Sequence, residues 1–318
     1  MFTKLWHSWK ARSESRANLD RELHKFVSAI NPQLLQSAGY PNQYRSAMQK
    51  AIQYVEALTT EIPGPVAMTH EHFNNNPLVH ALFASARELT KNLHLSIAMK
   101  QYTPPQPGEQ CMFAVMGVRW DRIQRYGIEQ QGGVLRSDVP QQAINFKDHT
   151  FIFPAASENE ARQLLQDHFL KRLANEVRES IQSLEQQRQQ LFLQGKKMEG
   201  ELRQSNPPDR EQPQREIEQL WKQWRELSQR LDINNTIGHF EQIMRDPAQY
   251  LRLEPYQLSI DSMGIERPPS EGGETLNLVN LYGADRRIWT VMLVQFFWQR
   301  PPTAEEQIEQ AYRWLTIS

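Results

Sequence analysis

The residues best suited to chemistry are a small group of histidines near position 75. His70 and His72 lie two residues apart, which on an extended segment would place both imidazoles on one side, as metal sites often require. Glu71 or His80 could supply a third ligand. The spacing typical of zinc-dependent hydrolases is missing, however, and the asparagines at 74–76 favour a loop. We therefore predict no metal site and no cofactor.

The sequence offers no recognisable nucleophile. Its single cysteine, Cys111, begins a predicted strand and has no histidine at a diagnostic spacing. The phosphate-binding glycine loop and the G-x-S-x-G elbow do not occur in the sequence. Five carboxylates in the β-rich segments are candidates for a general acid or base, although they match no motif. They are Asp121, Glu129, Glu266, Glu274 and Asp285. We expect a non-catalytic protein, with an enzyme as the open alternative.

Arginines in two β-rich segments would form one basic surface if both segments share a sheet. They are Arg119, Arg122, Arg125, Arg286 and Arg287, with Trp120 and Tyr126 interleaved. Such a surface could meet phosphates and bases, whereas arginines on strands also commonly protect sheet edges. The chain carries 36 Lys and Arg against 37 Asp and Glu, so it has no basic surplus. Nucleic acid is therefore an unlikely partner, and a site near Arg119 and Arg286 is the alternative.

The amino terminus carries an aromatic stripe with helical spacing. Its residues are Phe2, Leu5, Trp6 and Trp9, flanked by Lys4, Lys10, Arg12 and Arg16. A helix over the first ten residues would present these aromatic side chains next to cations. Such a stripe packs on the protein's own core, lies on a membrane surface or enters a partner's groove. We keep the stripe as a candidate partner-binding element.

The pattern from residue 17 to residue 102 is helical. Apolar residues recur every three or four positions over 19–30, 44–58 and 78–97. Asn31-Pro32 and the prolines at 63 and 65 end the first two helices, and Asn76-Pro77 is an N-cap followed by proline at the first helical position. We predict a helical domain over 1–102 and a proline-rich linker over 103–110.

Strand-like segments follow the linker. Residues 112–120, 122–128 and 150–153 are rich in β-branched and aromatic types, and a second block covers about 251–298. In that block, 275–282 and 287–298 suggest a hairpin, whose second strand is apolar on both faces and should be central. The prediction is an antiparallel or mixed sheet built from 111–156 plus 247–318. A short helix should follow Thr303.

A heptad pattern separates the two β-rich blocks. Ser157 and Glu160 form a capping box at its start, and the prolines at 207 and 208 interrupt it. The seam residues are Val177, Ile181, Leu184, Leu191, Gly195, Met198, Leu202, Ile217, Leu220, Trp224, Leu227 and Leu231. We predict an antiparallel coiled-coil hairpin inserted at 157–246, the alternative being two ordinary helices packed on the sheet. Paired residue numbers should sum to roughly 417, which places Gly195 opposite 221–224.

These patterns together predict an α+β protein with a projecting helical arm. Residues 167–232 contain 12 basic and 12 acidic residues, which suits protein contacts better than binding a polyanion. One cysteine fits a reducing compartment, and no segment approaches the roughly 20 apolar residues of a membrane-spanning helix. We expect a cytoplasmic assembly or adaptor protein whose arm binds a protein partner or a second copy. Exposed apolar patches would favour an adaptor, and a deep polar cleft an enzyme.

Overall fold

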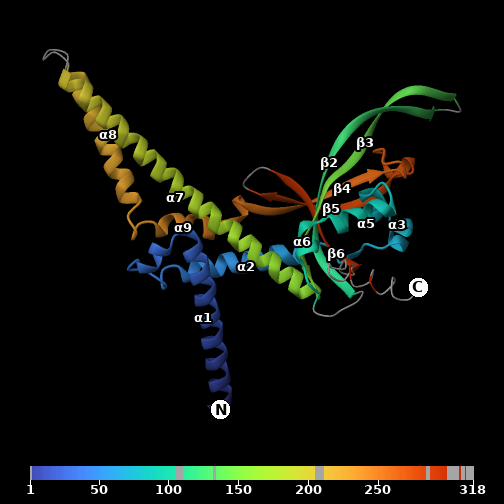
Figure 1. Cartoon of the computed structure of the whole chain (residues 1–318), viewed down its shortest axis with the longest axis horizontal. Helices are drawn as coiled ribbons and strands as arrows, with labels where there is room; N and C mark the ends of the chain where they lie inside the picture. The colour runs from blue at the N-terminus through green and yellow to red at the C-terminus, as the bar shows by residue number, and fades with distance from the viewer. Residues whose placement is uncertain are drawn as a thin grey trace. The chain divides into compact units, whose positions relative to one another are not determined.

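The computed structural model describes residues 2–104, 110–131, 134–204, 211–283 and 287–298, with positions 308 and 312; side chains at 2–15, 129–131 and 134 are outside this description. The chain combines helices with a largely antiparallel sheet, so the predicted α+β class is confirmed (Figure 1). Its contacts divide it into two compact units. The first joins Met1–Ala57 to Gln166–Arg252, and the second joins Leu58–Leu165 to Leu253–Ser318.

The first unit is helical. It contains α1 (Phe2–Ile30), a 3-10 helix (Pro32–Gln36), most of α2 (Arg45–Glu61), α8 (Glu211–Arg230), α9 (Ile237–Arg245) and the greater part of α7 (Glu158–Gln204). Phe240 of α9 meets Phe26 and Tyr44 edge-on, with ring centroids 5.7 and 4.9 Å away. Arg45 donates to Asp20 at 2.7 Å and so links α2 to α1. These contacts fix α1, α2 and α9 around one core.

The helix α7 is continuous over 47 residues. The predicted capping box lies at its start, where Ser157 Oγ accepts from the Glu160 N–H at 3.2 Å and Glu160 Oε2 accepts from the Ala156 N–H at 3.1 Å. These bonds satisfy the orphan N–H of Glu160 and the N–H of Ala156, which precedes the N-cap. The helix α8 lies alongside the second half of α7 (Figure 1).

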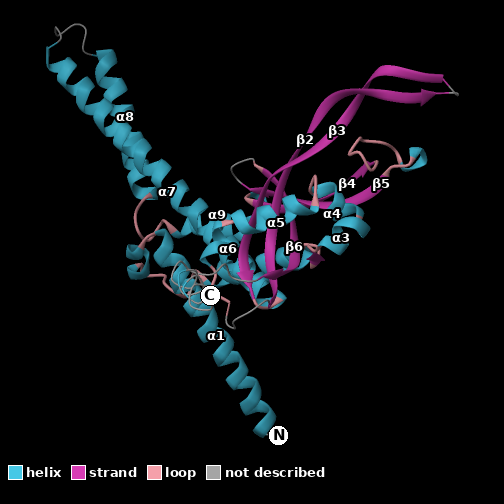
Figure 2. Cartoon of the chain, turned by 45° about the vertical axis from the view of Figure 1, so that its right-hand side comes forward, coloured by secondary structure: helices cyan, strands magenta, loops and turns pink. Residues whose placement is uncertain are grey.

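The second unit contains the sheet. Its strands are β1 (Val66–Ala67), β2 (Gln110–Gln131), β3 (Val134–Ala155), β4 (Leu251–Ile260), β5 (Glu274–Gly283) and β6 (Ile288–Trp298). The order is β3-β2-β6-β5-β4, with β1 added in parallel to β6 (Figure 2). Both β-rich blocks therefore enter one sheet, and the doubly apolar strand is central, as predicted. Residues 291–294 are all buried.

Short helices cover this sheet. They are α3 (His70–Asn75), α4 (Pro77–Leu82), α5 (Ala86–Leu95) and α6 (Ile97–Gln101). Val79, Leu82 and Leu89 from these helices share one core with Met112 and Met116 of β2. The compact units therefore do not follow the predicted boundary at residue 102, because the apolar face over 78–97 packs on the sheet.

The predicted single helical face over 78–97 is interrupted twice. Ser85 caps α5 by accepting from the Glu88 N–H at 3.1 Å, and Ser96 caps α6 by accepting from the Met99 N–H at 3.4 Å. Each serine has an extended or otherwise non-helical backbone. Because serine competes for backbone N–H groups, both positions divide the helix. Apolar spacing alone does not reveal these breaks.

Strands β2 and β3 form a long ribbon. Pairing of β2 with β6 covers 110–118, whereas its pairing with β3 continues to Gln131. Three register shifts occur along the pair, and Asp138, Asp148 and Phe153 have positive φ values of 61°, 57° and 56° beside them. Such β-bulges increase strand twist and bend a ribbon. The ribbon is visibly curved in Figure 2. The strands predicted at 112–120, 122–128 and 150–153 are shorter than β2 and β3, which cover 22 residues each.

Some predicted features lie outside the described residues. These are the linker core at 105–109, the prolines between α7 and α8, and most of the helix after Thr303. Among the helices that are described, none has the length and apolar character needed to cross a bilayer.

Candidate functional site

The predicted seam residues lie on shielded sides of α7 and α8. Every one of them is buried or half-buried, from Val177 to Leu202 on α7 and from Ile217 to Leu231 at the end of α8. Val177 is completely shielded, whereas Ile217 and Leu227 keep a little exposure. This burial agrees with packing between the two helices. The finer statement, that the helices interlock as a coiled coil, stays a prediction.

Gly195 of α7 faces Trp221 of α8. A Cβ atom added at Gly195 would lie 3.0 Å from Cζ2 and 3.1 Å from Cε2 of the indole, closer than side chains normally pack. The indole Nε1 donates to Glu199 Oε1 at 2.9 Å, one turn along α7. The missing side chain thus gives the indole its place, and the contact agrees with the predicted opposition of Gly195 and 221–224.

A lysine completes this contact. Lys196 Nζ donates to Glu199 Oε2 at 3.0 Å and lies 5.4 Å from the Trp221 ring centroid. The hydrogen bond from Lys196, and after it the bond from Trp221, lowers the pKa of Glu199 below its ordinary value. The Glu199 carboxylate thus accepts charge-assisted hydrogen bonds from both Lys196 and Trp221, and the bond from Trp221 joins α8 to α7.

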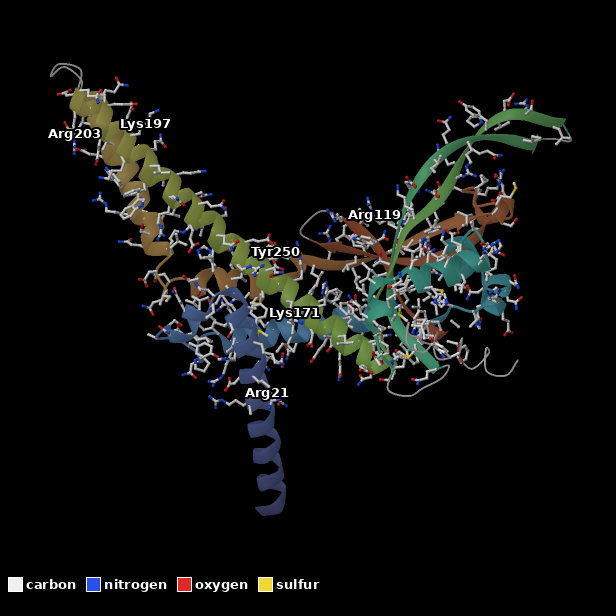
Figure 3. The ribbon with its side chains drawn as sticks, in the orientation of Figure 1. Arg21, Arg119, Lys171, Lys197, Arg203 and Tyr250 are labelled. Carbon is white, nitrogen blue, oxygen red and sulfur yellow. The ribbon has the colours of Figure 1, made fainter. Side chains whose placement is uncertain are left out.

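Aromatic side chains continue this contact to the surface. Phe192, Trp221 and Trp224, which we call the aromatic cluster, have ring centroids 5.8 to 6.3 Å apart. Phe192 is 40% exposed and its neighbour Leu193 is 59% exposed. Lys197 and Arg203 project from the same helical pair (Figure 3). We call residues 185–204 of α7, together with α8, the arm.

The β2–β3 ribbon carries a second exposed apolar group. Tyr126, Ile128 and Leu135 are 71%, 67% and 72% exposed. Leu135 pairs with Gln130, so all three side chains belong to one face of the ribbon. The sequence analysis did not identify this group: Tyr126 and Ile128 lie in the predicted strand 122–128, and Leu135 lies in no predicted strand. Their exposure follows from the strand pairing, because the β2–β3 pair continues well beyond the part of β2 that pairs with β6.

Arg122, one of the arginines predicted to form a basic surface, is bound to a carboxylate. Arg122 donates to both carboxylate oxygens of Glu266 at 2.8 and 2.9 Å and to the Tyr256 hydroxyl at 2.8 Å. Its hydrogen bond lowers the pKa of Glu266, and its guanidinium lies 5.4 Å from the Trp120 ring centroid. Arg122 therefore ties the ribbon to the segment after β4.

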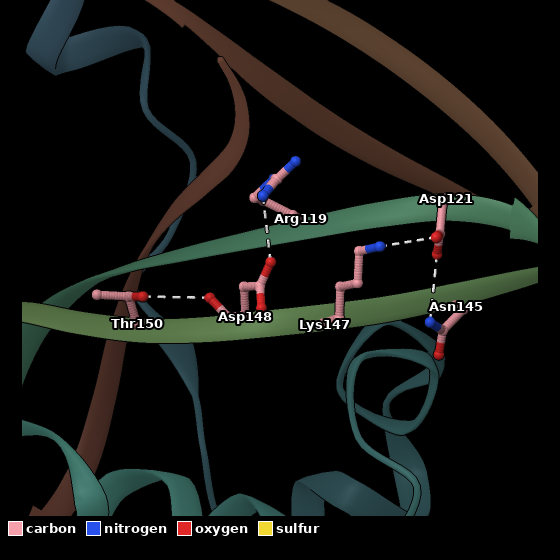
Figure 4. Close-up of polar contacts among 6 residues, drawn as sticks. All are labelled: Arg119, Asp121, Asn145, Lys147, Asp148 and Thr150. Atoms are coloured by element: carbon pink, nitrogen blue, oxygen red, sulfur yellow. Dashed lines mark hydrogen bonds and ion pairs between the residues drawn. The ribbon is translucent and has the colours of Figure 1, made fainter.

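The neighbouring charges on β2 are also paired. Arg119 Nη1 meets Asp148 Oδ2 at 3.3 Å, and Lys147 donates to Asp121 at 2.7 Å, with Asn145 at 3.2 Å (Figure 4). In a strand, residues 119 and 122 point to opposite faces, so these two arginines do not share one face. Arg287 is exposed, and Arg286 lies outside the described residues.

A polar hollow lies between the short helices and the sheet. Its volume is about 590 Å³, and its lining includes His80, Arg125, Asp261 and Glu274. Asp261 accepts from the N–H groups of Met263 and Ile265 at 2.9 and 3.0 Å, and from Arg267 at 2.9 Å. This carboxylate therefore holds a turn in place. The hollow is the feature closest to the cleft expected of an enzyme.

The histidine cluster has a geometry different from the expected one. Residues 70–75 are helical, and on a helix positions two apart point to nearly opposite sides. The His72 ring contacts Thr69 Oγ1 at 2.9 Å, and the His80 ring packs on Phe73 at 4.9 Å. Within the described ranges, no three His, Cys, Asp or Glu side chains are grouped to hold a metal ion.

The single cysteine lies in β2, where the Cys111 Sγ atom accepts a hydrogen bond from Gln295 Nε2 at 3.0 Å.

The amino-terminal stripe belongs to α1, which begins at Phe2. The side chains of Phe2, Leu5, Trp6 and Trp9 lie outside the described residues. Their role as a partner-binding stripe stays a prediction.

The function therefore has to be argued from these surfaces. No protein-family model, curated protein or solved structure matches the chain.

Proposed function

We propose that the protein is a non-catalytic cytoplasmic adaptor that binds partner chains through the arm. The observation that carries this proposal is the exposure of Phe192, a member of the aromatic cluster, and of its neighbour Leu193. Large apolar side chains gathered on a surface are typical of protein interfaces, and tryptophan is prominent among the residues that dominate binding energy. The balanced charge of residues 167–232 agrees with a protein partner.

The physical cost of the arm supports the same proposal. Ordering a residue costs about 1 to 2 kcal/mol of conformational entropy, so a helical pair of this length needs a compensating role. We propose that α7 and α8 form an antiparallel coiled coil whose seam keeps the pair rigid. The exposed apolar side chains outside the seam then remain free for a partner. The single cysteine fits action in a reducing compartment.

The alternative is an enzyme or nucleic-acid-acting subunit with a site near Arg119 and Arg286. Arg125 and the polar hollow favour it, whereas the ion pairs of Arg119 and Arg122 oppose it. Fluorescence anisotropy with a single-stranded oligonucleotide at low salt tests the nucleic-acid form. Binding that Arg125→Gln abolishes would support this alternative.

Affinity purification with quantitative mass spectrometry tests the adaptor function. Three variants are compared with the natural chain: replacement of 185–229 by a short Gly/Ser linker, the double change Phe192→Ser with Leu193→Ser, and Gly200→Ala as the matched control. The same partner should disappear from the first two and remain with the control. A partner set that survives replacement of 185–229 would contradict the proposal.

We further propose that α1 makes a second contact, either with a partner chain or with a membrane surface.

A further inference from the structure

An open hollow flanks the aromatic cluster on the arm. It has a volume of about 620 Å³ and is lined by Glu185, Arg188, Gln189, Phe192 and Trp224. Phe192 and Trp224 bring two aromatic rings to this lining, with ring centroids 6.3 Å apart. Its rim carries one acidic and one basic residue. The hollow therefore combines two aromatic rings with two opposite charges.

Glu185 and Arg188 make no ion pair with each other or with another described residue, whereas charges nearer the tip do. The two residues are three positions apart, which on a helix separates them by about 4.5 Å along the axis. A two-fold axis passing between them would place each Glu185 opposite Arg188 of a second copy. The charge pattern of the rim is thus complementary to itself.

We infer that the hollow is a self-association surface, on which the arms of two copies of this chain pack antiparallel. The Glu185 and Arg188 side chains form two equivalent intermolecular pairs, and Phe192 and Trp224 supply the apolar contact beside them. A second copy fits better than an acidic or basic partner, because residues 167–232 have no net charge. This inference rests on the proposed function of the arm and names its partner.

Sedimentation equilibrium of the full chain tests the inference with charge reversals. Natural protein should dimerise, and Glu185→Arg or Arg188→Glu alone should weaken dimerisation at least about tenfold, because each makes both pairs repulsive. An equimolar mixture of the two variants should associate at least as tightly as natural protein, since a rim with only positive charges then meets a rim with only negative charges. Circular dichroism checks that each variant keeps its helix content.

Two results would overturn the inference. One is a natural protein that stays monomeric up to about 100 μM, a concentration at which even weak specific dimers form. The other is a mixture that associates no better than either variant alone. Neither result would affect the adaptor function if affinity purification still finds an arm-dependent partner, so the two failures are distinguishable.

Discussion

Gly195 is the residue on which the packing of α7 against α8 depends most directly. Helical glycine costs about 1 kcal/mol relative to alanine, and here the space it leaves is occupied by the Trp221 indole. The seam spacing and the interrupting prolines were enough to predict that Gly195 lies opposite 221–224. The bond from Trp221 to Glu199 was not predictable, because it depends on rotamers that residue spacing does not fix.

Gly195→Leu should therefore destabilise the arm by about 1 to 3 kcal/mol, although leucine favours helix, because the new side chain overlaps the indole. Thermal unfolding followed by circular dichroism at 222 nm checks this expectation. Gly200→Ala is the control: a Cβ atom there meets nothing within 4 Å, so the change should be neutral or stabilising by up to about 1 kcal/mol. A higher melting temperature for Gly195→Leu would contradict the packing described.

Glu199 should make the stability of the arm depend on pH. Its pKa is lowered in the folded chain by Lys196 and then by Trp221, so its contribution is present above the ordinary carboxyl value of 4.5 and is lost as the pH falls through the folded value. Glu199→Gln should melt below the natural protein at pH 7. The difference should shrink as the pH is lowered from 7 to below 4.5. A difference that is constant over this range would refute the assignment.

Elements differ in how well sequence predicts them. The central strand β6, the capping box of α7 and the N-cap at Asn76 have local residue signatures, and all three are present. The ribbon and its bulges were missed. Aspartate tolerates positive φ, but Asp121 of the same ribbon lies at no register shift and Phe153 is of another residue type, so only pairing with the neighbouring strand locates the shifts.

Arg122 should contribute more than Arg119 to the free energy that stabilises the β2–β3 ribbon. Arg122→Lys keeps the charge but loses the two-pronged contact with Glu266 and the bond to Tyr256, so we expect a loss of about 1 kcal/mol. Arg119→Lys should cost less than about 0.3 kcal/mol, since its pair with Asp148 is exposed and long. Differential scanning calorimetry compares them. Equal losses would show that the Glu266 contact does not anchor the ribbon.

For the whole molecule, the division into two compact units has a direct consequence. The buried clusters of the sheet unit draw on β1 to β6 and α3 to α6 and contain no residue of the arm. Replacing 185–229 by a Gly/Ser linker should therefore preserve the strand signal in circular dichroism and the protection of β6 amides from hydrogen exchange. Loss of both would mean that the arm is part of the core of the sheet unit.

We propose that the arm is the surface that contacts partner chains. Photo-crosslinking in the cell tests it most directly, with a benzophenone amino acid placed at Leu193 on the arm or, as a control of similar exposure, at Ile97 on α6. We expect discrete higher-mass adducts from Leu193 and none from Ile97. Adducts from a third probe at Tyr126 on the ribbon, with none from Leu193, would contradict it and assign partner binding to the sheet unit.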